Sequence, residues 1–160
     1  MAIQKITPFL WYDTQAEAAA ELYTSIFDNS RIIEVQRYGN GGPMPAGSAM
    51  TVTFELEGLQ FIALNAGPQF KFTEAVSFYV SCDDQEEVDY FWQKLTAGGG
   101  EESMCGWLKD RFGLSWQIVP DRLIELLTDP DPEKSGRVTQ AMLQMQKIEI
   151  AELERAASGG

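Results

Sequence analysis

Hydrophobic and polar positions alternate along several short stretches of the chain. Residues 5–12, KITPFLWY, place Thr7, Phe9 and Trp11 on one side, and this period of two predicts a β-strand. Three further strands of the first half are expected at residues 31–38, 49–57 and 59–67, the last two joined by a hairpin turn at Gly58.

A helix is expected at residues 13–27, between the first two strands, because apolar residues recur there at helical spacing. Thr14 and Glu17 fit a capping box at its start. Residues 39–48, GNGGPMPAGS, hold too much glycine and proline for regular structure. We expect a flexible loop there, long enough to act as a lid.

The second half repeats the order of the first. A strand at residues 74–82, a helix at 83–100 and a hairpin at 105–119 are expected. The apolar positions of the two helices correspond one to one: Ala19, Leu22, Tyr23 and Ile26 in the first, Val88, Phe91, Trp92 and Leu95 in the second. The pattern therefore predicts an α+β chain with two β-α-β-β-type units of similar length.

Beyond Pro120 the pattern becomes helical, in segments split by the prolines of DPDP. The tail at residues 121–160 has an apolar side that includes Met142, Met145 and Ile148. A short helical tail cannot bury such a side alone. We expect it to pack on the domain of residues 1–120 or on a partner subunit.

Charge and composition limit the class of protein. The chain of 160 residues has a formal net charge of -12, from 24 acidic and 12 basic residues. Binding of nucleic acid or of an anionic membrane is disfavoured, because both usually require a basic patch. No apolar run approaches the roughly 18 residues of a membrane span, and the start shows no secretory signal. With only two cysteines, at no metal-binding spacing, a cytoplasmic protein is expected.

The most discriminating fact in the composition is that the chain contains no histidine. Ser-His-Asp triads, Cys-His dyads and histidine-ligated metal sites are therefore excluded. Any metal site would have to use carboxylates, carbonyls, amides or thiolates.

Two stretches carry a family resemblance: FLWYDTQAEAAAELYTSIF near the start, and GWLKDRFGLSWQIVP near the end of the second unit. With the paired units, they resemble the PhnB-like branch of the vicinal oxygen chelate superfamily, which includes glyoxalase and bleomycin-resistance proteins. Many proteins of the branch carry the name 3-demethylubiquinone-9 3-methyltransferase domain protein. The resemblance implies two β-α-β-β-β modules, at about residues 3–68 and 73–120, that curl a sheet around a cavity. It also implies a homodimer, because a second chain often completes that cavity.

Metal-dependent members of the superfamily place four ligands, His, Gln or Glu, on the cavity faces of four strands. The fourth position follows a turn in which Asp is followed by Gly at the third residue and by a ligand Glu four residues later. Asp110 and Gly113 match that turn here, and Gln117 takes the place of the glutamate.

The other three positions fall, by the same resemblance, at Thr7, at Asn65 or Ala63, and at Ser77. Thr7, Asn65, Ser77 and Gln117 are all uncharged, whereas a divalent cation prefers anionic oxygen or imidazole. We therefore expect no bound metal and no cofactor. Four polar side chains on a cavity wall suit hydrogen bonding to a small ligand instead.

Aromatic side chains and one cysteine complete the candidate site. Phe9, Trp11, Tyr79 and Trp107 are candidate apolar wall residues, although core packing also explains aromatic residues on strands. Cys105 lies close to Trp107 in sequence. A nucleophilic role for this thiol would need a lowered pKa, whereas a small buried hydrophobe is the simpler interpretation.

Three functions remain open. The first is a cytoplasmic, metal-free protein that binds a small molecule. The second is an enzyme that acts through Cys105 or through a metal recruited by the ligand. The third is a scaffold with a collapsed cavity. Methyl transfer is not expected, because GNGG and AGGG do not stand between a first strand and a helix, where nucleoside cofactors are bound.

Overall fold

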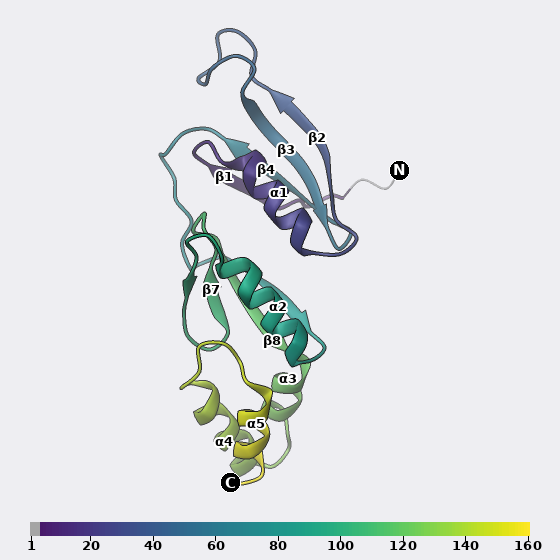
Figure 1. Ribbon diagram of the computed structural model, residues 1–160, viewed down its shortest axis with the longest axis vertical. Coiled ribbons are helices and arrows are strands. Elements are labelled where there is room, and N and C mark those ends of the chain that lie inside the picture. The colour runs from purple at the N-terminus through teal and green to yellow at the C-terminus, as the bar shows by residue number, and fades with distance from the viewer. Residues whose placement is uncertain (1–3) are drawn as a thin grey trace. The chain divides into compact units, whose positions relative to one another are not determined.

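The structure is a computed structural model that describes residues 4–160. The chain divides between Phe72 and Thr73 into two compact units. Each unit contains one four-stranded sheet with a helix on one of its faces (Figure 1). Among the described residues, no helix has the length and apolar content needed to cross a membrane.

The first module runs from β1 to β4. Its elements are β1 (Phe9–Tyr12), α1 (Ala16–Ile26), β2 (Arg31–Arg37), β3 (Ala49–Leu56) and β4 (Leu59–Asn65). The strands lie in the order β1-β4-β3-β2, with β1 parallel to β4 and the remaining pairs antiparallel. The expected hairpin at Gly58 is confirmed: Glu57 and Gly58 have φ angles of 50° and 83°, and a glycine tolerates such a turn without strain.

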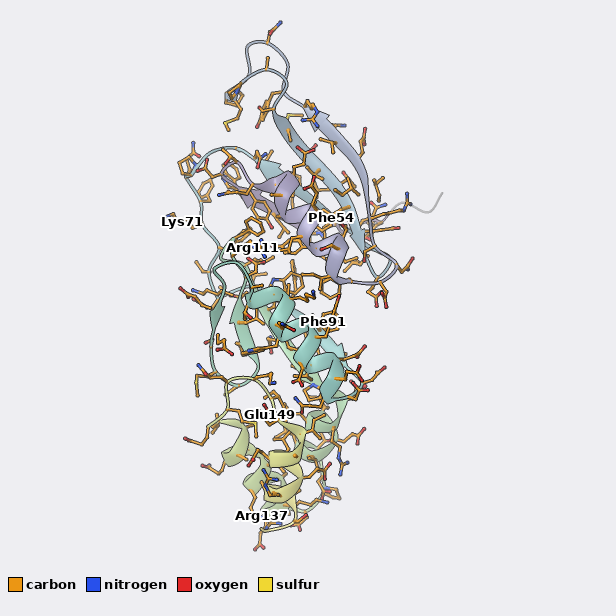
Figure 2. The ribbon with its side chains drawn as sticks, viewed as in Figure 1. Phe54, Lys71, Phe91, Arg111, Arg137 and Glu149 are labelled. Atoms are coloured by element: carbon orange, nitrogen blue, oxygen red, sulfur yellow. The ribbon has the colours of Figure 1, made fainter. Side chains whose placement is uncertain are left out.

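The core of the first module lies between α1 and the sheet. The ring of Tyr23 on α1 approaches that of Phe54 on β3, with 6.1 Å between centroids. Phe54, labelled in Figure 2, also stacks on Phe61 at 5.4 Å. All three side chains are buried. Alternation along β4 therefore separates a helix-covered face from the opposite face.

The second module repeats this arrangement with the same strand order, β5-β8-β7-β6. Its elements are β5 (Ser77–Cys82), α2 (Gln85–Thr96), β6 (Glu101–Glu102), β7 (Trp107–Lys109) and β8 (Ser115–Pro120). β5 is parallel to β8, and α2 buries Val88, Trp92 and Leu95. The repeat predicted from the sequence is therefore confirmed. The two-residue strand β6 completes the β-α-β-β-β order that the family resemblance implies, although Glu101 and Glu102 show no strand pattern of their own.

The expected capping box at the start of α1 does not form. The helix begins at Ala16, after Gln15, and neither Thr14 nor Glu17 caps it through its side chain. The Ala16 N–H instead donates to the Asn65 side-chain oxygen, 2.8 Å away. Glu17 pairs with Arg37 on β2, so the sequence pattern was correct for the helix and wrong for its cap.

The glycine-rich loop at residues 39–48 extends the β2–β3 hairpin and is largely exposed. Its two ends are joined through Tyr38: the Tyr38 N–H donates to the Ser48 carbonyl, and the Gly47 N–H donates to the Tyr38 carbonyl. The Tyr38 hydroxyl also donates to the Asn65 carbonyl at 2.5 Å. The base of the loop is thus fixed, and a lid role for its tip stays a prediction.

The tail consists of three helices, α3 (Asp121–Leu127), α4 (Pro132–Met142) and α5 (Ile150–Ala157). They enclose a small apolar core with the end of β8, made of Val119, Leu123, Leu126, Val138, Met145, Ile148, Leu153 and Ala157. The apolar side of the tail is therefore buried within the same chain. A homodimer stays a prediction that rests on the family resemblance.

Polar contacts attach the tail to the second module. The Gln85 side chain at the start of α2 donates to the Ile148 carbonyl at 3.0 Å and accepts from the Ile150 N–H at 2.7 Å. Lys147 pairs with Asp89 one turn further along α2. Since the two bonds of Gln85 satisfy backbone groups at the start of α5, this side chain fixes the position of that helix.

Candidate functional site

The polar candidates of the second module lie on one face of its sheet, opposite the face that α2 covers. The register pairs Tyr79 with Gln117 and Trp107 with Gln117, so these three residues share a face. Phe78 and Trp116, one position along, point to the helix side and pack edge to face at 5.4 Å. The face opposite α2, called here the polar face, carries Ser77, Tyr79, Trp107, Lys109, Ser115 and Gln117.

Gln117 is the centre of the polar face. It is half-buried, and its side-chain nitrogen donates to the Ser77 hydroxyl at 2.9 Å. Among residues 4–160 its side-chain oxygen receives no hydrogen bond. The pair therefore presents an oriented amide acceptor and a hydroxyl to any group that approaches the face.

Two aromatic residues flank this pair. Tyr79 is 51% exposed and Trp107 is half-buried. Partial burial, with a smaller effect from the Asp121 carboxylate, raises the pKa of the Tyr79 phenol above its ordinary value. Tyr79 therefore stays protonated at neutral pH and can donate a hydrogen bond.

The turn before β8 sets the position of Gln117. Asp110 is 3% exposed, and its Oδ1 accepts from the backbone N–H groups of Phe112 and Leu114 at 2.8 and 3.2 Å. Its Oδ2 accepts from the Trp116 indole N–H at 2.9 Å. The carboxylate thus holds both the turn and the first residues of β8, which places the next residue, Gln117, on the polar face.

Cys105 lies in the turn that precedes β7 rather than on the strand itself. Its φ is 58°, and its N–H donates to the Met145 carbonyl of the tail at 2.8 Å. Gly106 is required beside it, since a Cβ there would lie 3.0 Å from the Ile118 carbonyl oxygen. The backbone at Cys105 therefore serves to dock the tail, and the role of its thiol stays a prediction.

The other cysteine, Cys82, is fully buried at the end of β5, on the helix-covered face. Burial, followed by the negative charges of Glu87, Asp121 and Asp83, raises the pKa of its thiol to about 12. This thiol is therefore protonated at neutral pH and is not a nucleophile.

In the first module the candidates Phe9 and Trp11 share the face opposite α1. Phe9 is 56% exposed, and Thr7 precedes the strand by two residues and is half-buried. The Trp11 indole N–H donates to the Gly67 carbonyl at 2.8 Å, and its ring meets Phe70 edge to face at 4.9 Å. These contacts hold Trp11 rigidly and leave Phe9 available for contact.

Asn65 lies on the other face of that sheet. It is 5% exposed, and besides capping α1 it donates from its side-chain nitrogen to the Ala49 carbonyl at 3.1 Å. Ala63 shares this helix-covered face. In the second module Gln117 stands opposite Tyr79. At the corresponding place in the first module, opposite Phe9, the register puts Ile62. Ile62 and Leu64 therefore face away from α1, and the candidates Ala63 and Asn65 face it.

The residues matched to metal ligands do not fit a metal. Asn65 is used for capping, and Ser77 and Gln117 are joined to each other. None of them carries a charge, which a divalent cation needs for tight binding. Within residues 4–160, no group of three or more His, Cys, Asp or Glu side chains is placed to hold a metal ion.

An α+β chain with two β-α-β-β-β modules, each a mixed four-stranded sheet with one helix, has the fold of the vicinal oxygen chelate superfamily. The profile of the family described as 3-demethylubiquinone-9 3-methyltransferase matches residues 4–119. The chain therefore belongs to this PhnB-like family. The tail helices lie outside the matched region.

Solved structures agree with this assignment. The PhnB protein of Bacillus cereus, also named for 3-demethylubiquinone-9 3-methyltransferase, is 38% identical, with a TM-score of 0.68 over 73% of this chain and 99% of its own. Protein PA1353 of Pseudomonas aeruginosa is 19% identical, with a TM-score of 0.60 over 74% and 100%. The fosfomycin resistance protein FosX of Mesorhizobium loti is 10% identical, with a TM-score of 0.52 over 74% and 91%. The last two show the fold alone. No curated protein matches the chain.

Proposed function

We propose that this PhnB-like protein binds a small molecule without a metal, and that the ligand lies on the polar face of the second module. Ser77 and Gln117 form hydrogen bonds to it, and Tyr79 and Trp107 contact its apolar part. The carrying observation is the Gln117–Ser77 hydrogen bond of 2.9 Å, which orients an amide at the position where the family resemblance implies a metal-binding glutamate.

The chemistry of this face supports a binding role. It combines an acceptor on Gln117, a protonated phenol on Tyr79 and the indole of Trp107, a mixture typical of sites that select a small ligand by a few placed polar groups. Phe9 and Thr7 lie in the first module and are not part of this proposal, and Asn65 is left out because both ends of its amide are used inside the core.

Methyl transfer, which the family description names, is not part of this proposal. Nucleoside cofactors are usually bound where a glycine-rich turn leads from a first strand into a helix. Here β1 is joined to α1 through Asp13, Thr14 and Gln15, and the Ala16 N–H at the helix start is already bonded to Asn65.

The alternatives make different predictions. An enzyme that acts through Cys105 requires a reactive thiol, and one that recruits a metal through its ligand requires metal uptake with that ligand. A scaffold requires neither. Elemental analysis of the purified protein addresses the metal directly: a stoichiometric transition metal would overturn the metal-free proposal.

A thermal-shift screen against a panel of small metabolites tests binding. A ligand that binds only the folded state raises the melting temperature, and 100-fold excess over Kd contributes about 2.7 kcal/mol. We expect at least one ligand to raise the melting temperature of the native protein and to do so much less with Gln117→Leu. Gln36→Leu makes the same change on an exposed strand of the first module and serves as the control.

The outcome against the proposal is equally concrete. If every shift seen with the native protein persists in Gln117→Leu, the polar face is not the binding site. A different outcome favours the enzyme alternative: no ligand raises the melting temperature of the native protein, but the native protein converts a metabolite of the panel and Cys105→Ser does not.

A further inference from the structure

The turn between β6 and β7 has a sequence that is unusual for its shape. Its two central residues, Cys105 and Gly106, have φ angles of 58° and 85°. The turn is closed by the Trp107 N–H, which donates to the Met104 carbonyl at 3.1 Å. Positive φ angles at both central residues match a type I′ turn, whose first central residue is usually Asn, Asp or Gly because other side chains are strained there. Cys105 therefore needs support from outside the turn.

That support comes from the tail. Residues 145–150, called here the strap, complete the connection from α4 to α5 and run along the turn (Figure 1). The Cys105 N–H donates to the Met145 carbonyl at 2.8 Å. The Gly106 N–H donates to the Gln146 carbonyl, also at 2.8 Å. Both central residues of the turn thus give their N–H groups to the strap.

Side-chain packing joins the same two segments. Ile148 is fully buried, and a Cβ added at Gly106 would lie 3.1 Å from its Cγ1 atom. On its other side, the Gly106 carbonyl accepts from the Ile118 N–H at 2.8 Å. The turn is therefore held between the strap and β8.

The strap is itself attached to α2. The Gln85 side chain donates to the Ile148 carbonyl and accepts from the Ile150 N–H. It also donates to Asp89 at 3.0 Å, and Asp89 pairs with Lys147. Since exposed ion pairs contribute little, the main attachments of the strap are the two backbone contacts of Gln85 and the buried side chain of Ile148.

Trp107 is the residue that this arrangement positions. It follows the turn directly, and its carbonyl accepts from the Ser103 N–H at 2.9 Å. The register places it beside Gln117 on the polar face. β7 has only three residues, and its outer neighbour β6 has two, so the sheet alone gives the start of β7 little support. The turn therefore sets the direction in which Trp107 enters the sheet.

We propose that the strap positions Trp107 for ligand binding, with Gln85 and Ile148 as the positioning residues. The inference rests on the proposed function, because Trp107 contacts a ligand only if the polar face binds one. The family match ends at residue 119. One wall of the ligand site therefore depends on a segment outside the family domain.

The test is fluorine NMR of the full-length protein, with its four tryptophans replaced by 5-fluorotryptophan. The signals of Trp107 and of Trp11, the reference in the first module, are assigned by their loss in the corresponding Phe variants. We expect one sharp Trp107 signal in the native protein. Gln85→Ala and Ile148→Ala should each broaden this signal or move it towards its position in urea, and should leave the Trp11 signal unchanged.

Each variant has a matched control. Gln93→Ala changes an exposed glutamine of the same helix. Leu153→Ala removes as many carbon atoms as Ile148→Ala, from a residue that is equally buried in the core of the tail. Leu153→Ala should lower the melting temperature, as Ile148→Ala does, but neither control should change the Trp107 signal.

A rescue variant separates positioning from stability. Cys105→Asn puts a usual residue at the first central position, so the turn should form without help from the strap. In the double variant with Gln85→Ala, the Trp107 signal should again be sharp. Amide hydrogen exchange gives a second readout: Cys105 and Gly106 should exchange about three- to tenfold faster in Gln85→Ala, the effect of losing about one hydrogen bond.

Three results overturn the inference. The first is a Trp107 signal that stays unchanged in both Gln85→Ala and Ile148→Ala. The second is equal broadening of the Trp11 signal, because the variants would then loosen the whole chain. The third is a double variant in which Cys105→Asn does not restore the Trp107 signal, because the strap would then stabilise the chain without acting through the turn.

Binding is measured separately, with each metabolite of the panel that raises the melting temperature of the native protein. Gln85→Ala should weaken its binding about three- to tenfold, and Cys105→Asn should restore it. If Trp107 loses its position while a metabolite that needs Gln117 binds as before, the inference is wrong and the proposed function stands without Trp107. If the Trp107 signal responds as expected but no metabolite needs Gln117, the strap positions Trp107 and the proposed function is wrong.

Discussion

Replacing Asp110 by alanine is the sharpest test of how the turn before β8 is held. This buried carboxylate accepts hydrogen bonds from three donors, the Phe112 and Leu114 N–H groups and the Trp116 indole. No other side chain in the β7–β8 turn has this arrangement of contacts. The variant removes all three acceptor contacts at once and leaves the sheet otherwise intact.

The cost follows from the burial of the donors. The bonds to Leu114 and to the Trp116 indole are buried, and a buried donor that loses its partner costs about 1–3 kcal/mol. The bond to Phe112 is partly buried and adds less. We therefore expect Asp110→Ala to lower the free energy of unfolding by about 3–6 kcal/mol, a large part of the 5–15 kcal/mol typical of a domain.

Asp110→Asn separates the two sides of the carboxylate. The amide oxygen can still accept from Phe112 and Leu114, whereas its NH₂ group would face the Trp116 donor. We expect a loss of about 1–3 kcal/mol, confined to that one contact. Trp116→Phe removes the donor itself, so the double variant Asp110→Asn/Trp116→Phe should show a coupling free energy of about 0.5–3 kcal/mol.

Urea unfolding followed by far-UV circular dichroism measures these differences, since tryptophan fluorescence would change with Trp116. Asp121→Asn, at the exposed start of α3, is the control for a change of one carboxylate. Losses below about 0.5 kcal/mol for both Asp110 variants, within the range of ordinary surface changes, would refute the structural role assigned to this residue.

Two further predictions concern buried polar groups. Asn65→Ala removes the cap of α1 and the donor to the Ala49 carbonyl, so it should lower the free energy of unfolding by about 2–4 kcal/mol. Asn40→Ala, in the exposed loop, is the control and should change the free energy of unfolding little. Equal losses for the two variants would mean that α1 needs no such cap. Cys82, with a thiol pKa of about 12 against an ordinary 9.0, should resist iodoacetamide in native protein at pH 8 and react after unfolding, as read by mass spectrometry. Between pH 9 and pH 12 the folded thiol keeps its proton while the unfolded thiol releases it. The free energy of unfolding should therefore fall as pH rises through this range, by up to about 1.4 kcal/mol per pH unit from this group. Alkylation of native Cys82 at pH 8 would contradict the assigned burial.

Local patterns in the sequence were sufficient for most of the fold. The alternation in residues 49–65, the turn at Gly58 and the repeated helical spacing predicted elements that the structure contains. Features that depend on distant residues were not accessible in this way. β6 forms because Glu101 and Glu102 pair with β7, and α1 begins where Asn65 can reach it, 49 positions along the chain.

The candidate site shows the same division. The family resemblance indicated Ser77 and Gln117, and strand alternation put Tyr79 on the face of Ser77. The register places these three residues on one face and adds Trp107 to it. The family resemblance placed the second position at Asn65 or Ala63, and both of these face α1. Only the register of β4 against β1 shows that Ile62 faces away from α1, opposite Phe9. Ser115 shares the alternation of Gln117, but only the packing around it reveals a hydroxyl without a partner.

The two modules begin their helices in different ways. Asp84 caps α2 from the adjacent position, accepting a hydrogen bond from the Glu87 N–H at 2.9 Å, so this helix carries its own start signal. The first N–H group of α1 is bonded instead to the side chain of Asn65, at the end of β4, and this contact requires β4 to lie beside β1. We therefore expect the two modules to differ in how their helices form: α2 can nucleate from neighbouring residues, whereas α1 is fully anchored only after β4 has paired with β1.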